Sequence, residues 1–110
     1  MKVQLIAYLL IAGAVPMAAQ TTFATITGVV TDPAGMTIAG AAITATHTQS
    51  NYRYTAQSNE TGTYTLAQLR EGEYTLQTQA AGFKEFVMRA VQLVALDVRR
   101  IDVKMELGAV

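Results

Sequence analysis

The stretch TGTYTLAQLREGEYTLQ, residues 61–77, carries nearly the same short pattern twice. Gly62-x-Tyr64-Thr-Leu returns ten residues later as Gly72-x-Tyr74-Thr-Leu. Each copy begins with the glycine of a polar turn and continues with apolar residues at alternate positions, which is typical of a β-strand with one buried face. The copies therefore predict two consecutive strands of one β-fold, because a stacked repeat needs at least about three copies.

The segments before residue 61 show the same succession of short strand patterns and turns. Asp32-Pro-Ala-Gly35 has the residue preferences of a type I turn, and Asn59-Glu-Thr-Gly62 also ends in the glycine that such turns favour. Short strands at this spacing indicate an all-β sandwich or barrel. The first three predicted strands cover residues 23–31, 41–48 and 52–57, and the repeated pattern supplies residues 63–66 and 73–80.

The region after residue 80 is less regular. Residues 84–96 mix alternating apolar positions with good helix formers, so a helix is an alternative there, although the surrounding β pattern favours a strand. In the last predicted strand, residues 98–107, Ile101 and the apolar residues after it alternate, whereas Val98 has the opposite parity. We expect a β-bulge at Arg99-Arg100 to restore the register. The prediction is a fold of seven strands.

The N-terminal residues differ in kind from the rest of the chain. Lys2 precedes an apolar run that ends at Val15, and Pro16 and several small residues follow. This is the pattern of a secretory signal peptide, and the run is shorter than the roughly 20 apolar residues that a membrane span needs. We predict that residues 1–19 are a signal peptide, cleaved after Ala19, and that residues 20–110 form the exported domain.

The charges of the chain balance, with eight basic and eight acidic side chains. No strong field therefore favours a nucleic acid or an anionic membrane surface as a partner. The chain has no cysteine, so disulfides and thiol chemistry play no part. An exported, nearly neutral domain without disulfides fits a bacterial periplasm or outer membrane better than a small secreted disulfide scaffold.

A set of spaced glycines and apolar residues runs through most of the predicted domain: Ile26-x-Gly-x-Val30-x-Asp32-x-x-Gly35, Gly62-x-Tyr64, Leu69-x-x-Gly72-x-Tyr74 and Ala81-Gly82-Phe83. In order and spacing it resembles the carboxypeptidase regulatory-like domains, over about residues 25–107. The resemblance implies a seven-stranded Greek-key β-sandwich of the transthyretin (prealbumin) type. It implies no peptidase activity, because the family name refers to a module attached to peptidases.

The C-terminal region carries a narrower resemblance. Gly82-Phe-Lys-Glu-Phe86, Val91-Gln-Leu93 and the run from Arg100 to Gly-Ala-Val110 resemble the N-terminal extension of TonB-dependent outer-membrane receptors, in which a plug and a barrel follow. The sequence departs from that pattern at Val94-Ala-Leu-Asp97, where the family has a glycine-containing turn. The resemblance implies a non-catalytic module that contacts cell-envelope proteins and meets the membrane only through a receptor barrel.

Few side chains of the chain suit catalysis. His47 is the only histidine, and Ser50 and Ser58 are the only serines. His47 follows buried positions on its predicted face, so we expect a structural role, and neither serine lies in a Gly-x-Ser-x-Gly motif. The carboxylates lie next to turns or basic neighbours and lack the spacing of a calcium loop. We therefore expect no enzymatic activity, no cofactor and no metal site.

The tyrosines beyond residue 20 fall into two pairs. Tyr64 and Tyr74 share their predicted faces with leucines two residues later, so we expect both rings in or near the core. Tyr52 and Tyr54 lie two residues apart on a predicted strand, where exposed rings could stack on a sugar. Half-buried packing is the favoured interpretation of this pair. A carbohydrate-binding, starch-binding-like module remains the alternative, with Tyr52 and Tyr54 as its candidate ligand platform.

Overall fold

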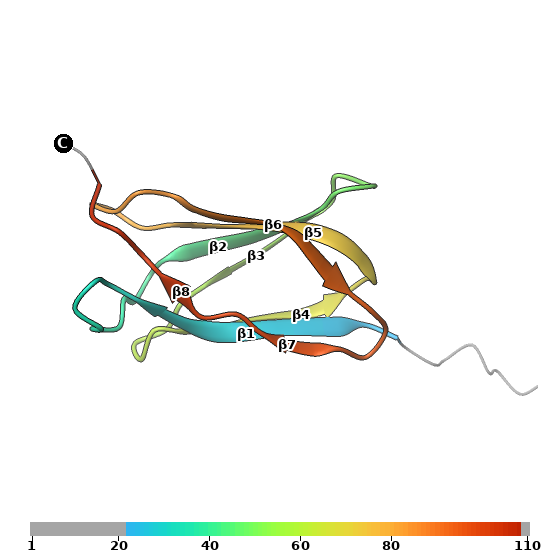
Figure 1. Ribbon diagram of the computed structural model, residues 1–110. Helices are drawn as coiled ribbons and strands as arrows, with labels where there is room; N and C mark the ends of the chain where they lie inside the picture. The colour runs from blue at the N-terminus through green and yellow to red at the C-terminus, as the bar shows by residue number, and fades with distance from the viewer. Residues whose placement is uncertain (1–21, 109–110) are drawn as a thin grey trace, which may run out of the picture.

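The computed structural model describes residues 22–108, which form two packed β-sheets (Figure 1). One sheet has the order β4-β1-β7, with β8 also paired to β1, and the other has the order β3-β2-β5-β6. The strands are β1 (Ala24–Thr31), β2 (Ala42–His47), β3 (Arg53–Gln57), β4 (Thr63–Leu69), β5 (Gly72–Gln79), β6 (Phe86–Leu93), β7 (Val98–Arg100) and β8 (Val103–Lys104). The predicted all-β sandwich is confirmed, and the predicted signal peptide lies outside the described residues.

The core lies between the sheets and is filled by alternate residues of the strands. In β1 every second residue from Ala24 is buried, and β5 buries Tyr74 and Leu76 in the same way. The two copies of the repeated pattern become β4 and β5, which lie in opposite sheets and both bury their apolar residues in the core. The largest fully buried side chains include Tyr64, Tyr74, Ile26, Ile43, Leu69, Leu76 and Met105.

Both predicted turns form as expected. The Asp32 carboxylate accepts hydrogen bonds from the N–H groups of Ala34 and Met36, at 2.9 and 2.8 Å. The Asn59 side-chain oxygen accepts from Thr61 and Thr63 in the equivalent way, each at 3.0 Å. These local bonds satisfy backbone donors that lie outside the ladders, which is why acidic and amide side chains begin such turns.

Two β-bulges lie at positions without a glycine. The β1–β4 register shifts at Gln68, and the β5–β6 register shifts at Ala90. Both residues have left-handed backbone angles, with φ of 60° and 58°. The bulge in β6 shifts the inward-facing positions from the partly buried Phe86 to the opposite parity at Val91 and Leu93. The strand prediction for this segment is confirmed.

The predicted bulge at Arg99-Arg100 is wrong. β1 pairs in parallel with β7 and then β8 in one continuous register, with no extra residue on either strand. Val98 is 75% exposed and points away from the core, so its parity needs no correction. The last predicted strand is instead interrupted at Ile101 and Asp102, and the seven predicted strands become eight.

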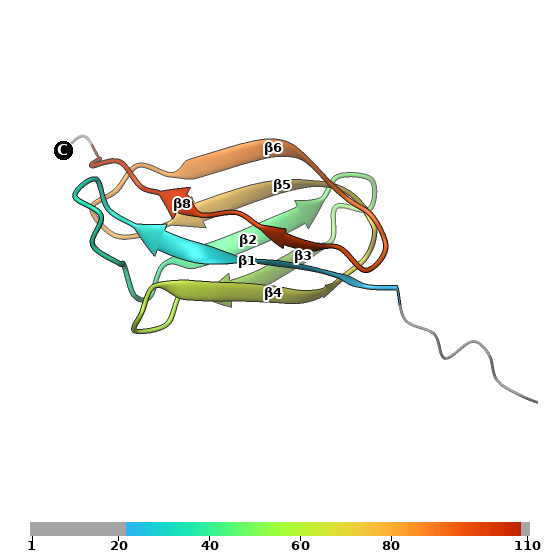
Figure 2. The ribbon, with the colours of Figure 1, turned by 60° about the horizontal axis from the view of Figure 1, so that its bottom comes forward.

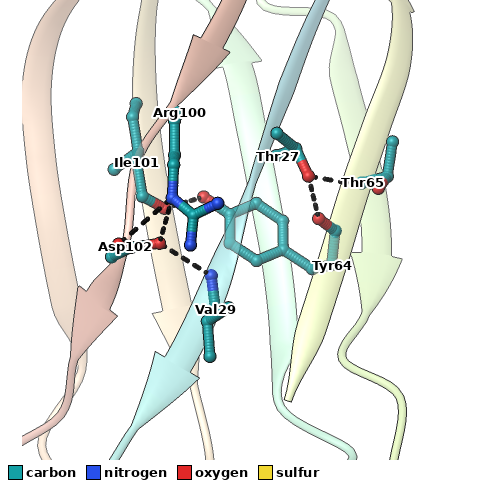
Figure 3. Close-up of polar contacts among 7 residues, drawn as sticks. All are labelled: Thr27, Val29, Tyr64, Thr65, Arg100, Ile101 and Asp102. Atoms are coloured by element: carbon teal, nitrogen blue, oxygen red, sulfur yellow. Dashed lines mark hydrogen bonds and ion pairs between the residues drawn. The ribbon is translucent and has the colours of Figure 1, made fainter. Parts of the chain in front are cut away.

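A close backbone approach causes that interruption (Figure 3). The Tyr64 hydroxyl donates to the carbonyl of Ile101 (2.6 Å), and the N–H of Val29 donates to the Asp102 carboxylate (3.0 Å). In a regular parallel ladder Val29 would donate to that Ile101 carbonyl instead. A Cβ atom on Gly28 would lie 2.0 Å from the Ile101 oxygen, so only glycine allows this approach. The Ile-x-Gly-x-Val and Gly-x-Tyr motifs therefore form one structural unit.

The two ends of the sandwich carry different segments (Figures 1 and 2). β1 begins at the end where the β2–β3, β4–β5 and β6–β7 connections also lie, and β8 lies toward the opposite end. Among the described residues, five of the nine exposed large hydrophobic side chains belong to the first end: Phe23, Tyr52, Val94, Leu96 and Val98. This end of the sandwich is therefore the candidate contact surface among the described residues.

Candidate functional site

The candidate platform residues have different environments. Tyr52 lies immediately before β3 and is 59% exposed, whereas Tyr54 lies within β3 and is half-buried. Their ring centroids are 4.9 Å apart and the ring planes meet at 70°. Because the rings stand edge to face, they form no flat surface of two coplanar rings on which a chain of sugars would stack.

The Tyr54 ring packs against the buried ring of Tyr74. Its centroid lies 6.0 Å from that of Tyr74, and the Tyr74 ring in turn lies 5.1 Å from His47, edge to face. The Tyr74 hydroxyl donates to the carbonyl of Arg70 (2.6 Å), which ties the ring to the β4–β5 turn. Tyr52 and Tyr54 are thus the outer end of a row of aromatic rings that begins at Tyr74 and His47 in the core. These contacts hold the two outer rings in place.

A shallow hollow of about 280 Å³ lies beside this pair, lined by Phe23, Tyr52, Tyr54, Gln68 and Arg70. We call this set the aromatic hollow. It lies between the open edges of β3 and β4, and its walls come from the start of β1 and from both of these strands. Gln68 is the bulged residue of β4, so its contribution depends on a backbone conformation that the sequence pattern did not predict.

The single histidine and a serine are within hydrogen-bond distance of each other. His47 Nδ1 lies 2.8 Å from Ser50 Oγ and also accepts the Ser50 N–H (3.2 Å). His47 Nε2 lies 3.2 Å from the carbonyl of Glu71, an acceptor, so Nε2 carries the proton and Nδ1 accepts. Among residues 22–108 no carboxylate bonds to this histidine, and its two ring nitrogens link the β2–β3 and β4–β5 turns. The prediction that His47 lies at a strand end and is buried is confirmed.

The remaining candidates for chemistry are also part of the framework. Ser58 is buried, donates to the carbonyl of Ile38 (2.7 Å) and accepts from the N–H of Ala41 (2.9 Å). Across the described part of the chain, no three His, Cys, Asp or Glu side chains are grouped as metal ligands would be. No helix among residues 22–108 has the length and apolar character of a membrane span.

The edge opposite the aromatic hollow is closed by basic side chains. Arg99 of β7 reaches across the sandwich and donates to the backbone carbonyl of Gln92 in β6 (2.8 Å). Arg100, the last residue of β7, forms an ion pair with Asp102 in the segment between β7 and β8, with 3.1 Å between nitrogen and oxygen. In the β6–β7 turn, Leu96 adopts φ of 67° and takes the conformation that a glycine would ordinarily supply.

Burial changes the titration of the two core tyrosines. Burial raises the pKa of Tyr64 above its ordinary value of 10.0, and the nearby Asp102 carboxylate adds to the effect, with Arg100 opposing it. Burial also raises the pKa of Tyr74, with a further contribution from Tyr54 and opposition from Arg70. Each phenol donates to a backbone carbonyl, which only the protonated form can do.

We expect the domain to lose stability at alkaline pH for this reason. The folded pKa of each phenol lies above the unfolded value, so the stabilisation is complete below pH 10 and decreases as the pH rises above it. Each tyrosine contributes a slope of at most about 1.4 kcal/mol per pH unit. Urea unfolding from pH 8 upward measures this slope. Tyr64→Phe should reduce the slope by the contribution of one tyrosine. An unchanged slope would show that the pKa of Tyr64 is not raised in the folded domain.

Comparison with known proteins identifies the fold family. A family model described as "Carboxypeptidase regulatory-like domain" matches residues 25–106. The chain belongs to this family. The matched range agrees with the predicted span of about residues 25–107, so the resemblance seen in the sequence is confirmed for the domain. A search of curated proteins found no match to the sequence.

Solved structures of similar shape share the fold of this carboxypeptidase regulatory-like domain at low sequence identity. Hydroxyquinol 1,2-dioxygenase from Pseudomonas putida DLL-E4 has a TM-score of 0.63 and 11% identity, covering 82% of this chain and 58% of that one. The Bacillus anthracis TIE protein has a TM-score of 0.65 and 14% identity, covering 78% of this chain and 17% of that one. This domain thus spans less than two thirds of either protein.

One further structure matches over most of its own length. It is the dioxygenase domain of a dioxygenase carbohydrate-binding protein fusion from Streptomyces sp. SirexAA-E, with a TM-score of 0.61 and 13% identity, covering 86% of each chain. Identities this low establish the sandwich fold alone, because unrelated functions recur on the same architecture.

Proposed function

We propose that this domain is an exported, non-catalytic interaction module, the N-terminal domain of a TonB-dependent outer-membrane receptor, which acts through contacts with cell-envelope proteins. One observation carries the proposal. The side chains suited to chemistry, His47, Ser50 and Ser58, are hydrogen-bonded to the framework. The exposed features are instead unpaired strand edges and apolar or aromatic groups at one end, which suit protein contacts.

The receptor assignment is supported by the sequence at the C-terminal side of the domain. After β8, the N–H of Gly108 donates to the carbonyl of Gly82 (3.0 Å), and the N–H of Lys84 donates to the carbonyl of Glu106 (2.8 Å). These bonds hold the segment that precedes the receptor-like Gly-Ala-Val against the β5–β6 connection.

Export is the first expected outcome. Protein recovered from the periplasm or the membrane fraction should lack Met1 to Ala19, because the apolar run fits a cleaved signal peptide. Intact-mass measurement of that protein checks this. Leu10→Arg places a charge in the apolar run, and this control should retain Met1 and stay in the cytoplasm. A retained Met1 on exported protein would contradict the prediction.

The second candidate function, carbohydrate binding, is favoured by the exposed ring of Tyr52 beside the aromatic hollow. We expect calorimetry with starch oligosaccharides to show no saturable heat, because the paired rings stand at 70° and form no flat platform. Saturable binding that is lost in Tyr52→Ala or Tyr54→Ala would establish the carbohydrate function instead.

Catalysis should also be absent. We expect no turnover of peptide, ester or glycoside substrates, because among the described residues His47 Nε2 bonds a backbone carbonyl and not the carboxylate that orients the histidine of a catalytic triad. Assays with chromogenic substrates of each class measure this. Turnover that is abolished by Ser50→Ala, with the fold retained, would show that the His47–Ser50 pair is catalytic.

A further inference from the structure

We propose that the open edge of β3, together with the aromatic hollow, binds an extended acidic segment of a partner protein by strand addition. The inference rests on the proposed protein-contact function, and it specifies the surface and the chemistry of the partner. It combines three features that the fold places side by side: an unpaired regular strand, a hollow with an exposed ring, and an arginine without an ion pair.

The backbone of β3 is free along its outer side. β3 pairs only with β2 and lies at the edge of its sheet. The His47 N–H donates to the Tyr52 carbonyl (2.8 Å), and hydrogen-bonded pairs alternate along an antiparallel ladder, so Tyr54 also directs its backbone groups toward β2. The N–H and C=O groups of the intervening residues therefore point outward along the open edge: Arg53, Thr55 and Gln57.

The other edges are less receptive. β4 and β6 are each interrupted by a bulge, at Gln68 and Ala90, and bulges disfavour edge-to-edge pairing. The β7–β8 edge consists of two short strands that are interrupted at Ile101 and Asp102. In β6, the Gln92 carbonyl is already occupied by the Arg99 guanidinium. The pairing of β3 with β2 shows no register shift, so β3 presents a regular edge to an incoming strand.

The hollow would receive one side chain of the added strand. Side chains alternate between the two faces of a sheet, so a partner residue opposite Tyr54 would lie on the same face as Tyr54. That is the face that contributes to the aromatic hollow. The exposed surfaces of Tyr52 and Phe23, at 59% and 42%, would there contact an aromatic or aliphatic partner side chain.

Charge complementarity indicates that the partner segment is acidic. Arg70 is the only charged residue that lines the hollow. Within the described residues, the only ion pairs are Lys84–Glu106 and Arg100–Asp102, so neither Arg70 nor the neighbouring Arg53 has a carboxylate partner. A glutamate two residues from the side chain in the hollow would lie on the same face, within reach of Arg70. A neutral sugar would leave this charge unmatched.

The test uses a synthetic strand and the protein as exported. The probe is acetyl-Thr-Glu-Thr-Phe-Thr-Glu-Thr-amide, and backbone amide resonances are followed by NMR during titration. We expect saturable shifts confined to residues 52–57, Gln68 and Arg70. Replacing both peptide glutamates with glutamine should weaken binding about five- to ten-fold. Arg70→Gln should remove that difference, whereas Arg89→Gln on the opposite edge should preserve it.

A second variant tests strand addition itself. Thr55→Pro removes an outward N–H and no hydrogen bond to β2, so it should abolish binding, while Thr55→Ala should retain it. If Thr55→Pro does not fold, a probe peptide methylated at alternate backbone nitrogens tests the same hydrogen bonds with the unaltered protein. We expect this methylated peptide not to bind.

Several outcomes would overturn the inference. Shifts confined to β6, equal affinity for the glutamate and glutamine peptides, or no saturation at millimolar peptide would each contradict it. Saturable shifts of the hollow residues with maltoheptaose would assign the site to carbohydrate. Chemical-shift changes on β6 would leave the proposed protein-contact function intact. Failure of export would overturn that function and would say nothing about peptide binding.

Discussion

Gly28→Ala is expected to destabilise the domain strongly. The added Cβ would lie 2.0 Å from the carbonyl oxygen of Ile101 and 2.7 Å from its carbon, and both atoms belong to the backbone. Side-chain rotation cannot relieve this overlap, so β1 and the β7–β8 segment must separate. That separation also disturbs the bond between the Tyr64 hydroxyl and Ile101. We expect a cost of at least about 3 kcal/mol, at the upper end for overpacking.

Gly35→Ala is the matched control for this substitution. Gly35 has φ of 88° and open space around the position of a Cβ atom, so alanine there meets only backbone strain. That strain costs about 1–2 kcal/mol. Urea unfolding of both variants measures the difference. A cost for Gly28→Ala no larger than that for Gly35→Ala would show that the approach to Ile101 is not required.

Leu66→Ala combined with Leu76→Ala is the second change with a large expected effect. The two side chains are 3% and 0% exposed and pack into the core from opposite sheets. Each truncation should cost about 2–5 kcal/mol, through lost transfer energy and a residual cavity. Because a domain holds only about 5–15 kcal/mol in total, the double variant should be unfolded or close to it.

Threonines next to these leucines provide the control. Thr65 is exposed and Thr75 is half-buried on the outer faces of their strands. Thr65→Ala and Thr75→Ala should each change stability by about 0.5 kcal/mol or little more, as is usual for surface positions. Equal costs for the leucine and threonine variants in urea melts would mean that the assignment of faces is wrong.

The features predicted from sequence are those set by local pattern. Alternation in residues 61–77 indicated the buried faces of β4 and β5, and the turn residues Asp32 and Asn59 indicated where strands end. Side chains alternate across a strand, and turn side chains bond to nearby amides, so a short window of sequence suffices for both. The topology was predicted from the family motifs, because a short window of sequence does not specify how strands are ordered in a sheet.

The features that were missed depend on distant contacts or on strain. Gly28 shows as a glycine on a buried face, but the carbonyl that requires it belongs to Ile101, far along the chain. The bulges at Gln68 and Ala90 lack a glycine, so their left-handed conformations leave no sequence signal. The aromatic hollow joins Phe23, Tyr52 and Arg70 from three separate segments, and only the Tyr52–Tyr54 pair was visible as a candidate.

Photocrosslinking in living cells can detect whether this end of the domain contacts a cell-envelope protein. A photoreactive benzoylphenylalanine replaces Tyr52 in the exported protein, or Thr44 of β2 as a control on the outer face of the same sheet. We expect a protein adduct from position 52 that is lost when Thr55→Pro is added, and none from position 44. An equal adduct from both positions, or no protein adduct from position 52, would show that this end of the domain is not the contact surface.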